Sequence, residues 1–391
     1  MTRFAVTDQG RSWDELRSEV PGRDFHDWPA YKSLKSLTIR ALDSVGVFAL
    51  LRRAHLHSLL VLTYHDVLPS PLDVTNPLLG LAVDTGTFRA QMRELREHHV
   101  PVSLVEVLKW LRQGAELPSH AALVTFDDGH RNLRQHALPI LLEFGIPAVV
   151  FVTAGFLGER YRLTWFEELF AAVMSTAVPT LRSEGRELSL GDRESRARLC
   201  GHLIDHARQL SPRDLDALRD EVLGQLGVTT PAALPEERFA WLTAEDCAHL
   251  VEGGVTIGAH SLSHPLLKTL DDTAAMHEIE GSKKALEAQV GCRVDGFAYP
   301  FGEPGIDFAE REMGMAKTAG FSAAFAASGG LVCRSANPWC LPRVGMGQVN
   351  MPEFRFAASG THHLVRGRQW PSCSEGGSGS SRGLGADISW D

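Results

Sequence analysis

Long hydrophobic runs are the first feature that this sequence lacks. No apolar stretch approaches the roughly 20 residues that a membrane span requires, and residues 1–8 lack the apolar core of a signal peptide. We therefore expect no membrane span and, by default, a cytoplasmic protein. Residues 45–51, flanked by Arg40, Arg52 and Arg53, are typical either of a helix in peripheral contact with a membrane surface or of an ordinary packing helix.

Paired cysteines and a basic stripe are also absent. The six cysteines are scattered without a Cys-x-x-Cys pair, so neither a cysteine zinc site nor a disulfide framework is indicated. A formal charge of -9 argues against a nucleic-acid partner and against a strongly anionic polymer as substrate, and it favours a neutral substrate. The chain has 391 residues, 44% of them hydrophobic, which is enough for a barrel enzyme in one domain.

Strand-like and helix-like segments alternate along most of the chain. The strands are expected at 59–63, 123–126, 148–152, 255–259 and 296–299, and the helices at 87–98, 104–111, 138–144, 243–253 and 272–290. This alternation predicts an α/β fold with a parallel sheet, either a barrel or a doubly wound sheet.

Two segments interrupt this alternation. Residues 161–238 have a charged amphipathic pattern, which predicts a helical insertion that is either a lid or a surface excursion. From about residue 367 the chain is rich in Gly and Ser, which predicts disorder. The expected organisation is a partly helical N-terminal extension at 1–57, a catalytic domain at 58–345 and a C-terminal extension at 346–391.

Chemically active side chains follow the predicted strands directly. Asp127 and Asp128 follow one strand, and His260 and His264 follow another. Parallel α/β folds gather such positions at the carboxyl ends of their strands. One carboxylate and two imidazoles make a three-ligand metal site with open positions, and the second carboxylate is a candidate general base.

Each pair alone has a simpler interpretation. Asp before Gly is common in turns, and a chain with 17 histidines contains chance histidine pairs. The matching topological positions of the two pairs favour a metal-dependent hydrolase.

These residues also resemble a known family. Thr-Phe-Asp-Asp-Gly at 125–129 and His-Ser-Leu-Ser-His at 260–264 resemble the first two motifs of the NodB-homology polysaccharide deacetylases, also called carbohydrate esterase family four. The resemblance covers residues 59–344 apart from the insertion. It implies a distorted (β/α) barrel, a divalent metal, and hydrolysis of an N-acetyl group on an amino sugar.

The resemblance also implies roles for single residues. Asp127 would be the general base, and Asp128, His260 and His264 the metal ligands. The Tyr-Pro-Phe-Gly segment at 299–302 occupies the place of the family's third motif, so the Phe301 N–H is the candidate donor to the oxyanion.

The sequence departs from the commoner family pattern at two points. Ala298 stands where many relatives carry an arginine that orients the base, and the late Leu-x-His that supplies a general acid is missing. Arg343 is the substitute for the first role, or else a surface or salt-bridged residue. Residues 62–67 resemble the early histidine segment of biofilm poly-N-acetylglucosamine deacetylases, so His65 is the candidate acid, or else a structural histidine. We interpret the pair at 362–363 as structural.

The expected function is metal-dependent release of acetate from an N-acetylated glycan. Two histidines and one carboxylate favour Zn²⁺, and Co²⁺, Ni²⁺ or Fe²⁺ fit the same ligand set. Two alternatives remain: a catalytically silent carbohydrate-binding protein, and a metal-dependent amidase that acts on a small molecule.

Overall fold

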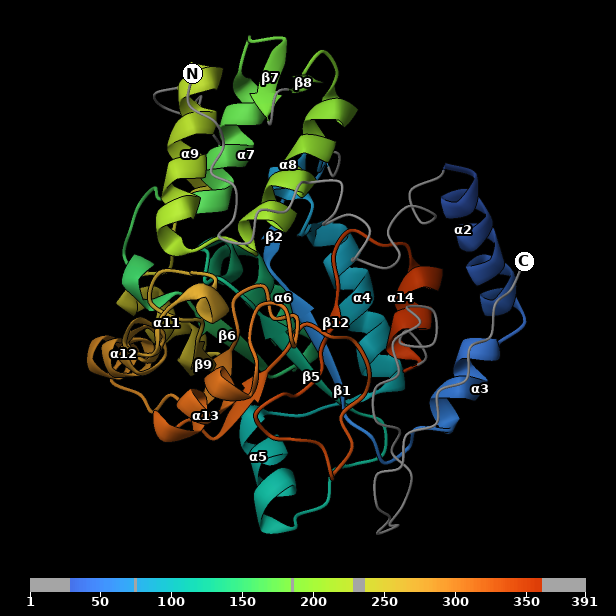
Figure 1. Ribbon diagram of the computed structural model, residues 1–391. Coiled ribbons are helices and arrows are strands. Elements are labelled where there is room, and N and C mark those ends of the chain that lie inside the picture. Colours follow the sequence, from blue (N-terminus) through green and yellow to red (C-terminus); the bar gives the residue numbers. More distant parts are fainter. Residues whose placement is uncertain (1–28, 74–75, 184–185, 228–235, 361–391) are drawn as a thin grey trace, which may run out of the picture.

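The computed structural model describes residues 29–73, 76–183, 186–227 and 236–360 (Figure 1). Its strands are β1 Leu60–Tyr64, β2 Asp66–Leu68, β3 Ala82–Asp84, β4 Val100–Pro101, β5 Ala121–Phe126, β6 Ala148–Val152, β7 Thr180–Ser183, β8 Arg186–Ser189, β9 Val255–Ala259, β10 Gly296–Ala298, β11 Ala323–Phe325 and β12 Val344–Gly345. Its α-helices are α2 Pro29–Ser44, α3 Val47–Arg53, α4 Thr85–His98, α5 Leu104–Gln113, α6 Leu138–Phe144, α7 Trp165–Ser175, α8 Arg193–Ala207, α9 Pro212–Leu226, α10 Glu236–Phe239, α11 Ala244–Glu252, α12 Asp272–Val290, α13 Glu310–Thr318 and α14 Met351–Ala358. Shorter turns are η1 Pro77–Leu79, the π-helical η2 Leu133–Ala137, η3 Ala154–Phe156 and η4 Leu267–Thr269.

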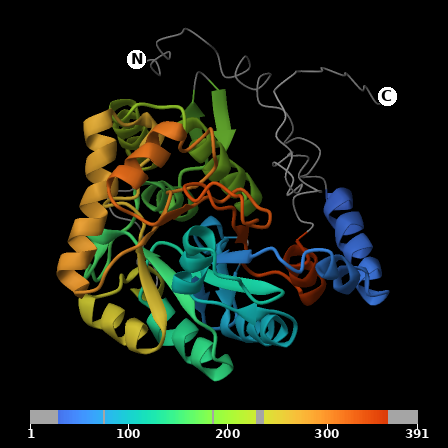
Figure 2. The ribbon, with the colours of Figure 1, turned by 90° about the horizontal axis from the view of Figure 1, so that it is seen from below.

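A parallel sheet forms the centre of the molecule. Its order is β11-β10-β9-β6-β5-β1-β12, and the short β4 pairs with the start of β5. The sheet curls, and helices surround it (Figure 2). This arrangement confirms the predicted distorted (β/α) barrel. Because every strand in the sheet runs the same way, the carboxyl ends of the strands lie together at one end of the curl.

Both faces of the strands are buried, which explains their nearly continuous apolar sequences. Alternate residues of β1, such as Leu62 and Tyr64, pack with Phe88 of α4. The residues between them, such as Val61, belong to a second cluster with Trp110 of α5. The strand period of two therefore divides β1 between two hydrophobic clusters.

Several predicted bounds are confirmed to the residue, namely those of β6, β9 and α12, whereas β5 begins two residues before the expected strand. The limits of α12 follow from its ends: the Asp271 side chain accepts the Ala274 N–H, and Gly291 ends the helix at φ 71°. Thr243 and Asp246 form a capping box that sets the start of α11.

The insertion forms a small unit above the sheet in Figure 1. Helices α7, α8 and α9 pack around their own buried cluster, which includes Leu169, Leu203 and Val222. The expectation that strands stop in this segment is wrong at one place, because β7 and β8 form an antiparallel hairpin there. Leu181 of this hairpin belongs to the same cluster, and Leu188 packs against it. One such residue per strand gives too weak a period-two signal to predict a strand.

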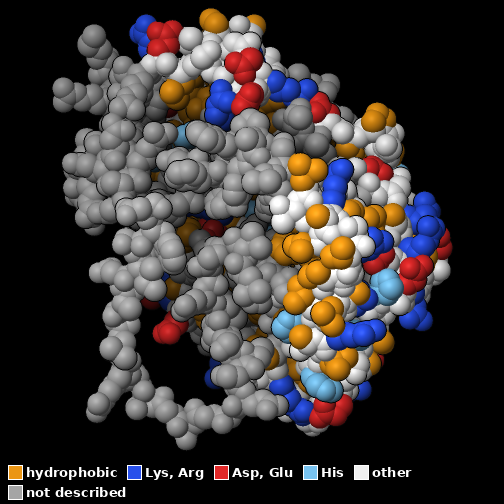
Figure 3. Space-filling view, turned by 90° about the vertical axis from the view of Figure 1, so that its right-hand side faces the viewer, with side chains coloured by type: hydrophobic (Ala, Val, Ile, Leu, Met, Phe, Trp, Pro, Cys, Tyr) orange, Lys and Arg blue, Asp and Glu red, His pale blue; other side chains and the backbone are white. Residues whose placement is uncertain are grey.

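The N-terminal and C-terminal extensions pack against each other beside the barrel. Helices α2 and α3 contact α14, and the ring centroids of Phe48 and Phe356 lie 5.4 Å apart. Val45 and Leu50 are 74% and 66% exposed, and hydrophobic and basic side chains gather on this face of the molecule (Figure 3). None of the described helices combines the length and apolarity needed to cross a bilayer. Membrane-surface contact stays a prediction, and the expected disorder beyond 367 and the histidines at 362–363 lie outside the described residues.

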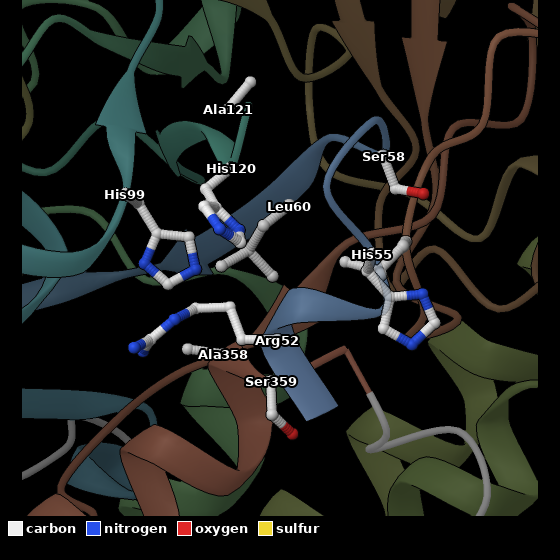
Figure 4. A pocket seen from close by; sticks show the side chains of 10 residues that line it. Arg52, His55, Ser58, Leu60, His99, His120, Ala121, Ala358 and Ser359 are labelled. Carbon is white, nitrogen blue, oxygen red and sulfur yellow. The ribbon is translucent and has the colours of Figure 1, made fainter. Parts of the chain in front are cut away.

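A polar cluster lies at the opposite end of the strands, beside Leu60 and Ala121 at the starts of β1 and β5. Arg52, His99 and His120 line a cavity of about 10 Å³ there (Figure 4), which has room for about one water molecule. Burial, with Arg52 and His120 nearby, lowers the pKa of His99 to about 3. This cluster is separate from the predicted site.

Candidate active site

The two aspartates lie in a tight turn at the carboxyl end of β5. The Asp127 N–H donates to the Tyr64 carbonyl on β1 at 2.9 Å, and the Thr153 N–H after β6 donates to the Asp128 carbonyl at 2.9 Å. Gly129 completes the turn at φ 91°, where an added Cβ would lie 3.1 Å from the Val152 backbone. Strands on both sides of β5 thus fix the backbone of both aspartates.

The two histidines lie in the loop that follows β9. The His260 N–H donates to the Val152 carbonyl at 2.9 Å, and the His264 N–H donates to the Ser261 Oγ at 3.0 Å. Glu278 of α12 accepts the Ser263 N–H at 2.9 Å and the Ser263 hydroxyl at 2.7 Å. Helix α12 therefore holds the loop that carries His264 through the Glu278 carboxylate.

Asp128, His260 and His264 converge as a possible metal site. Asp128 Oδ1 lies 3.6 Å from His260 Nε2 and 3.5 Å from His264 Nε2. Tetrahedral ligands at about 2.0–2.2 Å from a metal lie about 3.3–3.6 Å from one another, so this spacing fits a single ion. The Ala298 carbonyl lies 2.8 Å from His260 Nδ1. That contact favours the tautomer whose Nε2 lone pair faces Asp128.

The protonation states also fit metal ligands. Burial, together with the neighbouring His260, lowers the pKa of His264 to about 4, so its imidazole is neutral near pH 7. Burial alone would raise the pKa of Asp128, but His65 and the ligand histidines lower it below its ordinary value. A neutral imidazole and an ionised carboxylate are the forms that bind a metal.

Asp127 makes a two-point ion pair with Arg343. Arg343 Nη1 donates to Asp127 Oδ1 at 2.6 Å and Nη2 to Oδ2 at 2.8 Å. The guanidinium is 1% exposed, and its Nε donates to the Ala326 carbonyl at 3.1 Å. Burial alone would raise the pKa of Asp127, but Arg343 and His260 hold it well below its ordinary range. The carboxylate is therefore ionised and fixed in orientation.

The position of Arg343 explains how an arginine pairs with Asp127 although residue 298 is an alanine. The guanidinium lies over the Phe151 ring at 5.4 Å, and Phe151 and Ala298 belong to the same buried cluster. The cation therefore reaches Asp127 from the loop before β12 instead of from β10. A surface position for Arg343 is excluded, while its orienting role stays a prediction.

His65 lies on the same rim, between β1 and β2. Its charge lowers the pKa of both Asp127 and Asp128, which places the imidazole near both carboxylates. Its Nδ1 is buried and has no hydrogen-bond partner among the described residues. Asp66 follows His65 in sequence, but its carboxylate pairs with His130 and Arg238.

Phe301 forms the wall of the site next to His264. The two rings lie 5.0 Å apart, and the Phe301 backbone has φ 59°. Within the described residues its N–H makes no hydrogen bond. The N–H is thus available as a donor, and the ring packs on a ligand histidine.

Backbone strain gathers at this site. Of the five non-glycine residues with positive φ among the described ones, four are Asp128, Ser261, His264 and Phe301. Such conformations cost on the order of 1–3 kcal/mol each and persist where the surroundings impose them.

No sequence pattern indicated the buried network that ties the insertion to the site. Asp66 accepts from Asn132 at 2.7 Å and lies 2.8 Å from Arg238 Nε. Arg238, from α10, also donates to Glu167 of α7 at 3.1 Å. The capping box of Glu167 with Thr164 is readable from the sequence, but its pairing with Arg238 is not.

Aromatic and charged side chains of the insertion also reach the site. The Phe166 ring lies 5.5 Å from the rings of both His264 and Phe301. Arg208 lies 5.7 Å over the Phe301 ring and pairs with Asp307 at 3.1 Å. The insertion is therefore more than a surface excursion.

Comparison with known proteins finds a similarity to polysaccharide deacetylases. The polysaccharide deacetylase model matches residues 208–323, which include His260 and His264. The deacetylase PplD from Streptococcus pyogenes, solved with acetate, has the same fold with a TM-score of 0.50 at 17% identity, over 80% of this chain and 98% of that one. The chain is therefore similar to polysaccharide deacetylases in the matched segment and in its fold. The structure places the matched histidines against Asp127 and Asp128, which precede the matched residues.

Two proteins to which this chain is similar are named poly-β-1,6-N-acetyl-D-glucosamine N-deacetylase. The Escherichia coli (strain K12) protein is 39% identical over 70 residues, 18% of this chain and 10% of that protein. The Staphylococcus aureus (strain MSSA476) protein is 23% identical over 112 residues, 27% of this chain and 39% of that protein. The chain thus spans less than half the length of each relative.

Proposed function

We propose that this chain is a metal-dependent hydrolase that removes N-acetyl groups from an N-acetylated amino sugar in a poly- or oligosaccharide and releases acetate. One observation carries the proposal: a three-ligand metal site lies directly beside a buried carboxylate that Arg343 holds ionised. The names of the matched relatives support a β-1,6-linked N-acetylglucosamine polymer as substrate.

The ligand set fits a divalent ion, with Zn²⁺ the first choice and Co²⁺, Ni²⁺ or Fe²⁺ as alternatives. A divalent ion held by Asp128, His260 and His264 would polarise the amide carbonyl and acidify a water molecule. The spacing of the three ligand atoms and the neutral state of His264 support this assignment.

The remaining steps belong to the protein's own side chains. Asp127 would accept the proton of the attacking water, and Arg343 would keep both carboxylate oxygens in place. The Phe301 N–H would donate to the oxyanion of the tetrahedral intermediate. His65 would protonate the leaving nitrogen, because an amine is a poor leaving group without a proton.

Acetate release from a substrate panel tests the proposal. The metal-loaded protein would be incubated with β-1,6-linked and β-1,4-linked N-acetylglucosamine oligomers and with small N-acetylated amides that are not sugars. We expect acetate from the glycans. Asp127→Asn should retain the metal and lose about 100- to 10,000-fold in rate, whereas Asp128→Ala should lose both metal and activity.

Three other outcomes have distinct meanings. Release from the small amides alone would identify an amidase. Glycan binding without release by a metal-loaded protein would identify a silent binding protein. Full metal occupancy in a His260→Ala, His264→Ala double variant, measured by elemental analysis, would contradict the assigned ligands.

A further inference from the structure

A groove of about 530 Å³ lies between the insertion and the loop that follows His264. Helices α7 and α9 form one wall, and residues 263–270 form the other. This volume is within the roughly 300–1,000 Å³ typical of pockets that bind small molecules.

The groove lies next to the metal site. Ser263 and Pro265, the neighbours of the ligand His264 in sequence, both line it. Trp165 also lines it, and the Trp165 ring lies 5.9 Å from the Phe301 ring. Phe301 in turn lies 5.0 Å from the His264 ring, so Trp165 and Phe301 are the side chains that separate the groove from the metal site.

The walls offer apolar faces and hydrogen-bonding groups together. Tyr161 is 42% exposed at the groove, and Arg162 lies flat over the Phe156 ring at 4.1 Å. The Trp165 Nε1–H is buried with no acceptor among the described residues. Sugars present C–H faces that pack on aromatic rings and hydroxyls that pair with such polar groups.

The charges of the groove balance one another. Arg162 and Arg219 face Glu168 and Asp216, and Arg219 lies 3.7 Å from Asp216 and 3.9 Å from Glu168. A groove with two charges of each sign has no net attraction for a strongly charged polymer. It suits a neutral, hydroxyl-rich ligand.

We propose that this groove binds the neutral N-acetylated glycan chain beyond the sugar that is deacetylated, so that the insertion makes the protein select oligomers over single sugars. The choice of ligand rests on the proposed function, because a glycan at the metal site is the chain that would continue into the groove.

A matched pair of variants on α9 tests the proposal. Asp216 and Asp220 are 69% and 75% exposed, and each lies 3.7 Å from Arg219, but of the two only Asp216 lines the groove. Asp216→Trp would fill the groove, and Asp220→Trp would place the same side chain outside it. Binding of N-acetylglucosamine and of its β-1,6-linked hexamer would be measured by calorimetry. The metal-loaded Asp127→Asn protein would be used, because it should not deacetylate either ligand at an appreciable rate.

We expect the hexamer to bind at least about tenfold more tightly than the monomer, a difference of about 1.4 kcal/mol. Asp216→Trp should remove this difference, and Asp220→Trp should leave it unchanged. Equal binding of monomer and hexamer, or equal loss in both tryptophan variants, would overturn the proposal.

Acetate release separates this proposal from the proposed function. One outcome would support the groove and contradict the deacetylase. In it, Asp216→Trp abolishes selective hexamer binding, but the protein with an unaltered active site releases no acetate from any glycan. Acetate release at rates independent of chain length, with equal binding, would support the deacetylase and contradict the groove.

Discussion

At the scale of single residues, Arg343 and Asp127 form the most consequential contact. Both side chains are buried, so removal of one partner leaves the other charge without compensation. Arg343→Met should therefore cost about 3–5 kcal/mol in the free energy of unfolding. Chemical denaturation of the metal-free protein measures this cost.

The double variant Arg343→Met, Asp127→Asn is the control for that prediction. Without the carboxylate, no buried charge remains unpaired, so the double variant should be more stable than Arg343→Met alone. Equal instability of the two variants would mean that the lost packing of Arg343 on Phe151, and not the ion pair, sets the cost.

His65 is the residue whose role the geometry leaves as a prediction. His65→Ala should lower kcat strongly while metal content and fold stay unchanged. It should also remove or shift the alkaline limb of the pH–rate profile, because that limb reports loss of the proton from the general acid. A variant with wild-type kcat and an unaltered alkaline limb would return His65 to a structural role.

The residues predicted from the sequence share one property. Asp127, Asp128, His260 and His264 each follow a strand, so a local pattern and the rule of parallel sheets suffice to place them together. Glu278 and Arg238 have no such local signal, because their contacts depend on how α12 and the insertion pack. That packing is a tertiary property, which the periodicity of one sequence does not contain.

At the scale of elements, α12 holds the metal-ligand loop. Glu278 accepts from Leu262 N–H, Ser263 N–H and the Ser263 hydroxyl at 2.7–2.9 Å. Glu278→Ala should free this loop and weaken metal binding by about 10- to 100-fold, as loss of an outer-shell contact typically does. Titration against a competing chelator measures the affinity.

Glu280→Ala is the matched control on the same helix. Glu280 pairs with Lys284 at 2.7 Å on the surface and has no contact with the ligand loop in the described structure. Its replacement should leave the metal affinity unchanged. An equal loss of metal affinity in both variants would assign the effect to the helix as a whole. An unchanged affinity in Glu278→Ala would show that the loop keeps its conformation without Glu278.

The elements also show why some bounds were predictable. Helix α12 has apolar residues at helical spacing with a cap at Asp271 and a glycine at its end, so propensity, pattern and ends agree. Strands β2 and β3 have three residues each, which is too short for a periodic signal. Their pairing depends on the buried Asp66 network instead.

At the scale of the whole molecule, the two ends of the barrel have different tasks. The carboxyl ends of the strands carry the site and the insertion, and the amino ends carry the cavity of Arg52, His99 and His120 (Figure 4). The lower face of a β/α barrel usually serves stability. We therefore expect the polar cluster there to act on the free energy of unfolding.

His99 makes that stability depend on pH. Its pKa in the folded protein is lowered to about 3 by burial and by Arg52 and His120, whereas an unfolded histidine titrates near 6.5. Between these values the unfolded chain binds a proton that the folded protein does not, so stability falls as the pH falls below about 6.5. At pH 5 the loss from this one residue is about 2 kcal/mol.

His99→Gln should therefore lose less stability than the wild type between pH 7 and pH 5, by about that amount, in denaturation curves measured at both pH values. His57→Gln, which changes an exposed histidine, should keep the wild-type pH dependence, and an identical slope in all three proteins would show that His99 takes up its proton without unfolding the cluster.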